Sequence, residues 1–130
     1  METPTDWSAT PLLERRRFSR LNFPEPLRFR NVFKPHEDYS GALARDLSAR
    51  GVSITIHTFL PKDARLVVLL DLPELAQSMR IIGRVCWVQK EAASERFECG
   101  LEFIVMAPED HMRLADYVER GVVSPRPTLA

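Results

Sequence analysis

Residues Arg45–His57 read RDLSARGVSITIH, and this stretch decides the fold. In its second half, Val52, Ile54 and Ile56 alternate with polar residues, so they project to one face of an extended chain. Its first half places an aspartate, a serine and a glycine, which are common turn residues, ahead of this alternation. The stretch therefore predicts two β-strands joined by a short turn.

The same pattern recurs outward along the chain. Strands separated by turn residues are expected at residues 27–33, 41–47, 52–57, 65–72, 79–89 and 96–105. Six such strands predict a mainly β fold, a small antiparallel barrel or sandwich.

A single helix is expected after the last strand. Pro108 and the two acids that follow it suit a first helical turn, and Arg120-Gly121 indicates the helix end. The apolar stripe expected to pack on the sheet comprises Met112, Leu114, Ala115 and Val118.

Length and composition indicate one folded domain. The chain has 130 residues, of which 45% are hydrophobic and 28% charged, as is ordinary for globular proteins. Residues 1–13 are expected to form a flexible arm, residues 14–120 the domain, and residues 121–130 a flexible tail. The net charge of zero gives the molecule no long-range attraction for nucleic acid or an anionic membrane.

The sequence favours a cytoplasmic protein. It shows no signal peptide and no apolar run long enough to cross a bilayer. Two cysteines, Cys86 and Cys99, are too few for a disulfide scaffold. If Val85 and Trp87 share the core face with Cys99, Cys86 points the other way and the thiols stay free.

The opening stretch also carries candidate site chemistry. Asp46 and Ser48, two residues apart, are expected on the same face, and Gly51 allows a positive φ or close approach of a ligand. Upstream, residues 15–20 contain four arginines, whose guanidinium groups bind phosphates and guanine. A carboxylate complements the N1–H and amino donors of guanine, so the two segments together predict a guanine-nucleotide site.

At these residues the sequence resembles the PilZ domain, the bacterial receptor for cyclic di-GMP. Arg16 and Arg20 match the family motif Arg-x-x-x-Arg, and Asp46, Ser48 and Gly51 match Asp/Asn-x-Ser-x-x-Gly. GRVCWV and CGLEF resemble the fifth and sixth strands of the family. The resemblance covers about residues 14–120 and implies a six-stranded split β-barrel with one C-terminal α-helix.

The resemblance also implies a cyclic di-GMP site, with these residues: Arg15, Arg16, Arg20, Asp46, Ser48 and Gly51. By this likeness, Arg16 and Arg20 clamp the phosphates and guanine, and Asp46 pairs with guanine donors or an arginine. Ser48 donates to a phosphate or base. Arg15 is compatible with an intercalated pair of ligands.

The expected function is that of a non-catalytic receptor or adaptor. Ligand binding is expected to change the conformation of the arginine segment, and a separate effector protein to receive the signal. A monomer or weak homodimer is expected. One alternative is a PilZ-type interaction module that binds no nucleotide.

A second alternative is a nucleic-acid-binding barrel, because cations and aromatics interleave near the N-terminus at Arg15–Arg20, Arg28, Arg30, Phe18, Phe23 and Phe29. The neutral net charge argues against it. No metal or other cofactor is expected, because His36, His57 and His111 lack ligand spacing. The sequence contains no serine elbow and no HExxH motif, so no catalytic motif is found.

Overall fold

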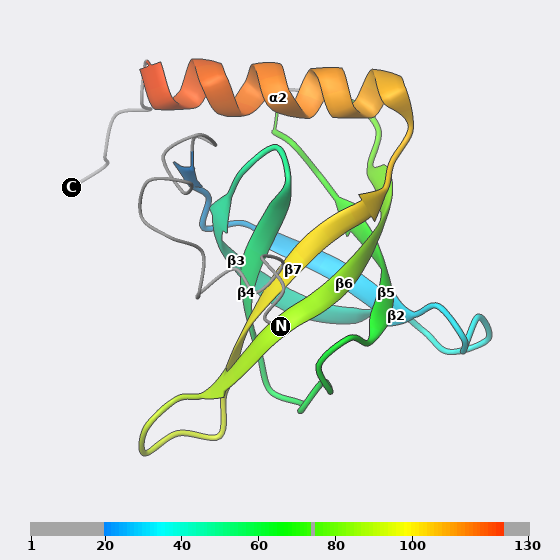
Figure 1. Cartoon of the computed structure of the whole chain (residues 1–130), viewed down its shortest axis with the longest axis vertical. Coiled ribbons are helices and arrows are strands. Elements are labelled where there is room, and N and C mark those ends of the chain that lie inside the picture. Colours follow the sequence, from blue (N-terminus) through cyan, green and yellow to red (C-terminus); the bar gives the residue numbers. More distant parts are fainter. Residues whose placement is uncertain (1–19, 74, 124–130) are drawn as a thin grey trace, which may run out of the picture.

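The computed structural model describes residues 20–73 and 75–123 (Figure 1). Short alternating segments form strands and the Pro108-led segment forms the helix, as the sequence patterns predict. The strands are β1 Leu21–Asn22, β2 Pro26–Asn31, β3 Ser40–Leu47, β4 Gly51–Ile56, β5 Arg65–Leu70, β6 Met79–Lys90 and β7 Phe97–Val105; the helix is α2 Pro108–Val123.

The strands close into an antiparallel barrel. Their order is β1-β3-β2-β5-β6-β7-β4, and an additional pairing of β3 with β4 closes the ring. The first half of β3 pairs with β2, whereas its last residues, Asp46 and Leu47, pair with β1. The predicted six-stranded barrel is confirmed, with β1 as an extra strand that the sequence patterns did not predict.

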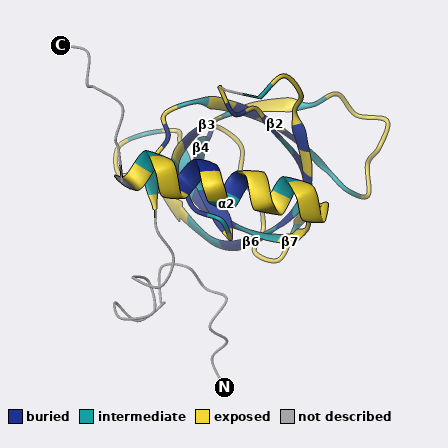
Figure 2. Cartoon of the chain, turned by 90° about the horizontal axis from the view of Figure 1, so that it is seen from above, coloured by how far each residue is buried: buried dark blue, intermediate teal, exposed yellow. Residues whose placement is uncertain are grey.

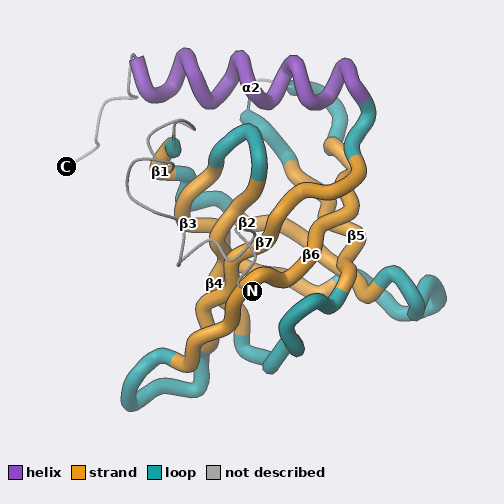
Figure 3. Tube along the Cα trace, in the orientation of Figure 1, coloured by secondary structure: helices purple, strands orange, loops and turns teal. Residues whose placement is uncertain are grey.

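The barrel core is built from the inward residues of this alternation, and α2 lies across one end of the barrel (Figure 2). Val52, Ile54 and Ile56 are at most 1% exposed, whereas Ser53 and Thr55 on the other face are partly exposed. The predicted facing of β4 is therefore confirmed. The turn between β3 and β4 rises toward the end that α2 covers (Figure 3).

A β-bulge in β3 changes which residues face outward. The register shifts between Ala44 and Asp46, so Ala44 and Leu47, three residues apart, are both fully buried. Strict alternation from Ala44 would have turned Asp46 inward. The extra residue instead places Asp46 on the outer surface.

A second bulge changes which residues of β6 face outward. The register shifts between Val85 and Trp87, and Val85 and Val88 both contact the core. Trp87 is therefore on the outer surface, and the expectation that it shares the core face with Val85 is wrong. The bulge, which no sequence pattern signalled, is the physical reason.

Both cysteines are buried and free. Cys99 belongs to the core, and burial raises the pKa of its thiol to about 11. Cys86 is in the β6 bulge and lies outside the core cluster. Its Sγ is 3.7 Å from Nη2 of Arg84, which donates to it.

Helix α2 packs through a stripe that shares Leu114 and Val118 with the predicted one but includes Tyr117 in place of Met112. Leu114, Tyr117 and Val118 are buried, whereas Met112 is 71% exposed, so its expected place in the stripe is wrong. The ring of Tyr117 meets the edge of Phe23, with centroids 6.2 Å apart. This contact orients the helix, and Met112, about 200° around the helix from Leu114, then faces away.

The helix also runs past its predicted end. It continues through Gly121 to Val123, so the expected tail is wrong for residues 121–123. A Cβ on Gly121 would lie 2.8 Å from Cδ1 and Cδ2 of Leu21. The glycine thus allows α2 and β1 to approach closely and does not stop the helix. The predicted arm, residues 1–13, and residues 124–130 lie outside the described residues.

Candidate functional site

The turn between β3 and β4 contains the second sequence motif. The Ser48 N–H donates to the Gly51 carbonyl at 2.9 Å, which closes the turn. The Ser48 hydroxyl accepts from the Arg50 N–H at 3.1 Å and donates to the Gly51 carbonyl at 3.4 Å. Because Ser48 is 2% exposed, its hydroxyl organises the turn and does not project beside Asp46 as expected.

Gly51 is the first residue of β4 and pairs with Glu102 of β7. No glycine among the described residues has a positive φ, so this predicted reason for Gly51 is wrong. Close approach of a ligand to its backbone stays a prediction. The Phe103 N–H donates to the Arg50 carbonyl at 2.8 Å, so the turn is also tied to β7.

Asp46 offers a half-buried carboxylate at this turn. Its N–H donates to Oγ of Ser53 at 3.3 Å, but its carboxylate has no hydrogen bond or ion pair with any residue that the structure describes. Its neighbour Arg45 pairs instead with Glu98. The Asp46 carboxylate is therefore available to a donor on a ligand or on an arginine.

A row of paired residues extends from Asp46 across the outer surface. Asp46 pairs with Ser53, Ser53 with Gly100, and Gly100 with Trp87. The indole lies against bare backbone, since a Cβ on Gly100 would be 2.1 Å from Nε1 of Trp87. This N–H is buried and has no acceptor among the residues that the structure describes. Sequence reasoning missed Trp87 and Gly100, because only the bulge turns the indole outward.

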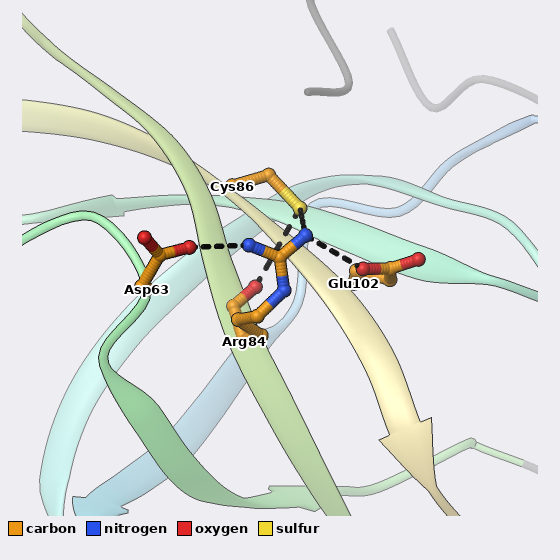
Figure 4. Close-up of polar contacts among 4 residues, drawn as sticks. All are labelled: Asp63, Arg84, Cys86 and Glu102. Carbon is orange, nitrogen blue, oxygen red and sulfur yellow. Dashed lines mark hydrogen bonds and ion pairs between the residues drawn. The ribbon is translucent and has the colours of Figure 1, made fainter. Parts of the chain in front are cut away.

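A second row lies two residues further along the strands. Gly51 pairs with Glu102, and Glu102 pairs with Arg84 of β6. Nη2 of Arg84 donates to Oε1 of Glu102 at 2.9 Å, and Nη1 donates to Oδ1 of Asp63 at 2.5 Å (Figure 4). Burial alone would lower the pKa of Arg84, but Glu102, Cys86 and Asp63 together raise it. The guanidinium therefore stays charged beside the turn.

The last residue of the first sequence motif, Arg20, lies beside the turn through its position before β1. Leu21 pairs with Leu47, so Arg20, which directly precedes β1, is next in register to Ser48. Arg20 is exposed. The structure thus brings Arg20 together with Asp46, Ser48 and Gly51. Arg15 and Arg16 lie outside the described residues.

Other candidate chemistry does not gather at this surface. Phe23 and Phe29 are buried in the core, so neither offers the stacking surface that the alternative of a nucleic-acid-binding barrel would need. Within residues 20–123, excluding position 74, no group of three His, Cys, Asp or Glu residues could hold a metal ion. No helix in the described part of the chain is long and apolar enough to span a membrane.

A closed antiparallel barrel with a helix across one end, and a polar hairpin turn next to Arg20, defines a small domain of a recognisable class. The chain belongs to the PilZ domain family, whose family model matches residues 14–120. A comparison with curated proteins found no match.

Solved structures share the fold at low sequence identity. The chain is similar to the Bacillus subtilis inhibitor of motility MotI/DgrA, with a TM-score of 0.68 and 20% identity over 86% of this chain and 53% of that one. It is also similar to Escherichia coli YcgR in complex with c-di-GMP, with a TM-score of 0.61 and 14% identity over 81% of this chain and 45% of that one. The chain thus spans about half the length of these proteins.

A third structure is the isolated PilZ domain of Escherichia coli YcgR with c-di-GMP. It has a TM-score of 0.60 and 14% identity over 82% of this chain and 92% of that one. The likeness is therefore to one domain of those longer proteins.

Proposed function

We propose that this chain is a non-catalytic receptor that binds cyclic di-GMP on the outer barrel surface beside the β3–β4 turn. The observation that carries the proposal is the half-buried Asp46 carboxylate, which has no partner among the described residues. It lies at one end of the row that also contains Gly100 and the Trp87 indole. Membership of the PilZ family supports the choice of ligand.

The row suits a guanine base. The Asp46 carboxylate accepts from the N1–H and amino donors of guanine, and an indole beside bare backbone offers an aromatic surface for stacking. Ser48 contributes mainly by holding the turn, because its hydroxyl is already hydrogen-bonded there. Gly51 is buried and contributes no side chain at this edge of the turn.

The arginine segment supplies the positive charge. Arg20 lies next in register to Ser48, and we expect Arg15, Arg16 and Arg20 to bind a phosphate on the β1 side of the turn. Charge-assisted hydrogen bonds contribute about 1.5–3 kcal/mol each. A few of them, offset by ordering of the segment, give an affinity of about micromolar.

The proposal includes a switch. Ligand binding orders residues 15–20 over the barrel, and the altered surface is recognised by a separate effector protein. Amide hydrogen exchange of this segment should slow when cyclic di-GMP is added. Unchanged exchange in a protein that binds the ligand would contradict the switch.

The test is isothermal titration of the wild-type chain with cyclic di-GMP, with GTP and cyclic AMP as control ligands. Asp46→Ala and Arg16→Ala should each weaken binding about tenfold or more, because each removes a charged ligand contact. Arg28→Ala is the matched control, because Arg28 is an exposed arginine on β2 that pairs with Asp71. It should leave the affinity unchanged.

Absence of heat from the folded wild-type protein at high micromolar ligand would overturn the receptor proposal. The chain would then be the alternative PilZ-type interaction module, and the search would turn to protein partners. The stoichiometry of a successful titration separates one bound ligand from an intercalated pair.

A further inference from the structure

The ion-pair cluster of Arg84, Glu102 and Asp63 lies beside the proposed site without belonging to either sequence motif. One guanidinium is shared by two carboxylates, so the formal charge of the cluster is negative (Figure 4). The Arg84 and Glu102 side chains are only 14% and 21% exposed, whereas that of Asp63 is 66% exposed. Largely covered ions on a barrel exterior are uncommon, and solubility alone does not explain them.

The strand register places Glu102 at the turn. It is the direct partner of Gly51, and side chains at directly paired positions lie about 5 Å apart at their Cβ atoms. Gly51 is buried and has no side chain between Glu102 and the turn. A ligand held beside this edge of the turn would therefore meet the Glu102 carboxylate.

Arg84 fixes this carboxylate in one orientation. It binds Oε1 of Glu102 through Nη2, while its Nη1 is held by Asp63. The backbone of Asp63 is tied to β6, because its N–H donates to the Val85 carbonyl at 2.8 Å. Oε2 of Glu102 accepts no hydrogen bond from the described residues, and a carboxylate oxygen has room for more than one donor.

The charge of the cluster selects what can bind there. A phosphate would be repelled by the net negative charge, whereas the N1–H and amino groups of guanine are donors that a carboxylate accepts. Adenine presents an acceptor at N1 in place of that donor, so a carboxylate discriminates against it.

We propose that Glu102 is a guanine-recognising residue of this site, and that Arg84, braced by Asp63, positions its carboxylate over Gly51. This inference rests on the proposed function. It adds a specificity residue on β7 to the two motifs, and it assigns the Gly51 edge of the site to a base and not to a phosphate.

The test compares the affinities for cyclic di-GMP and cyclic di-AMP by isothermal titration. Glu102→Gln keeps an oxygen that accepts from Arg84, so the pair geometry is retained while the charge and one acceptor are lost. It should lower the ratio of the two affinities about tenfold, mainly by weakening cyclic di-GMP. Arg84→Lys, which keeps the charge but cannot grip both carboxylates, should lower the ratio less.

Two further variants serve as a matched control and as a replacement for Glu102→Gln. Glu91→Gln is the matched control, because Glu91 also accepts from an arginine, Arg96, at 3.1 Å, but beyond the end of β6. It should leave the ratio unchanged. If Glu102→Gln does not fold, Glu102→Asp keeps the charge but withdraws the carboxylate by one methylene, and it should lower the ratio similarly.

An unchanged ratio in the folded Glu102 variants would overturn the inference, even when the wild type binds cyclic di-GMP. An equal loss for both nucleotides would also overturn it, because it would mean a merely structural role. Failure of the wild type to bind cyclic di-GMP would overturn the proposed function, and this inference with it. The wild-type titration alone separates that case from the others.

Discussion

At the scale of single residues, Gly41 and Gly100 are two barrel glycines with different surroundings. At Gly100 the missing side chain leaves room for the Trp87 indole, whereas a Cβ on Gly41 would meet nothing within 4 Å. The two positions therefore separate the effect of crowding from the general effect of replacing glycine by alanine.

Gly100→Ala should displace the indole, since the new Cβ would overlap its pyrrole ring. We expect a loss of about 1–3 kcal/mol in the free energy of unfolding and a shift in Trp87 fluorescence, measured in a Trp7→Phe background. Gly41→Ala, the control, should leave both unchanged or slightly stabilise the fold. Equal effects of the two substitutions would contradict the close packing of Trp87 on Gly100.

Cys99 gives the fold a pH dependence on the alkaline side. Its pKa is raised from 9.0 to about 11 by burial, so the folded state keeps a proton that the unfolded state loses. The contribution is fully present below the unfolded pKa and is lost as the pH rises toward the folded one. Between pH 8 and 10 the wild type should lose about 1 kcal/mol more stability than Cys99→Ala. Parallel curves from urea unfolding would contradict this prediction.

At the scale of elements, the contact between α2 and β1 links the end of the helix to the start of the barrel. Gly121 of α2 lies against the Leu21 side chain, and Leu21 pairs with Leu47 at the end of β3. A glycine inside a helix costs about 1 kcal/mol relative to alanine. The close approach of the two elements is a physical reason for keeping it.

Gly121→Ala should therefore change stability little, because the gain in helix propensity is offset by displacement of Leu21. In a Leu21→Ala background the obstacle is gone, and the same substitution should stabilise the fold by about 1 kcal/mol. Urea unfolding of the four proteins measures this difference. The same effect of Gly121→Ala in both backgrounds would show that the two residues do not interact.

The elements themselves were largely predictable, but their irregularities were not. Alternation in residues such as Val52, Ile54 and Ile56 located the strands, because a period of two is a local property of the chain. The bulges at Ala44/Asp46 and Val85/Trp87 depend on neighbouring strands and leave no local signal. The outward position of Trp87 was missed for this reason.

The candidate site was predictable to a similar extent. The motif turn at Asp46, Ser48 and Gly51 could be found because its residues are close together in sequence. Glu102 and Arg84 could not, because only the register of β4, β7 and β6 brings them beside Gly51. In the helix stripe, Leu114 and Val118 were predicted correctly. Tyr117 was missed because its burial depends on Phe23, which is far away in the sequence.

At the scale of the whole molecule, ligand binding should raise the thermal stability of the barrel. A ligand at about 100 times its Kd stabilises the folded state by about 2.7 kcal/mol, which for a domain of this size raises the Tm by roughly 10 °C. Cyclic di-GMP should produce this rise in the wild type and a smaller one in Asp46→Ala. Scanning calorimetry with and without ligand measures it, and an equal rise in both proteins would place the ligand elsewhere.

The anchoring of β1 also affects how the arginines that precede it would meet a ligand bound at the turn. Leu21 and Asn22 are fixed to β3, and whatever path the chain takes before them, the α-carbons of Arg16 and Arg20 are at most about 14 Å apart. A ligand already seated on the turn would thus meet these guanidinium groups at an effective concentration on the order of millimolar or higher. Capture by the arginines would then be an intramolecular step, whose strength is set by the length of this tether and not by the abundance of the protein.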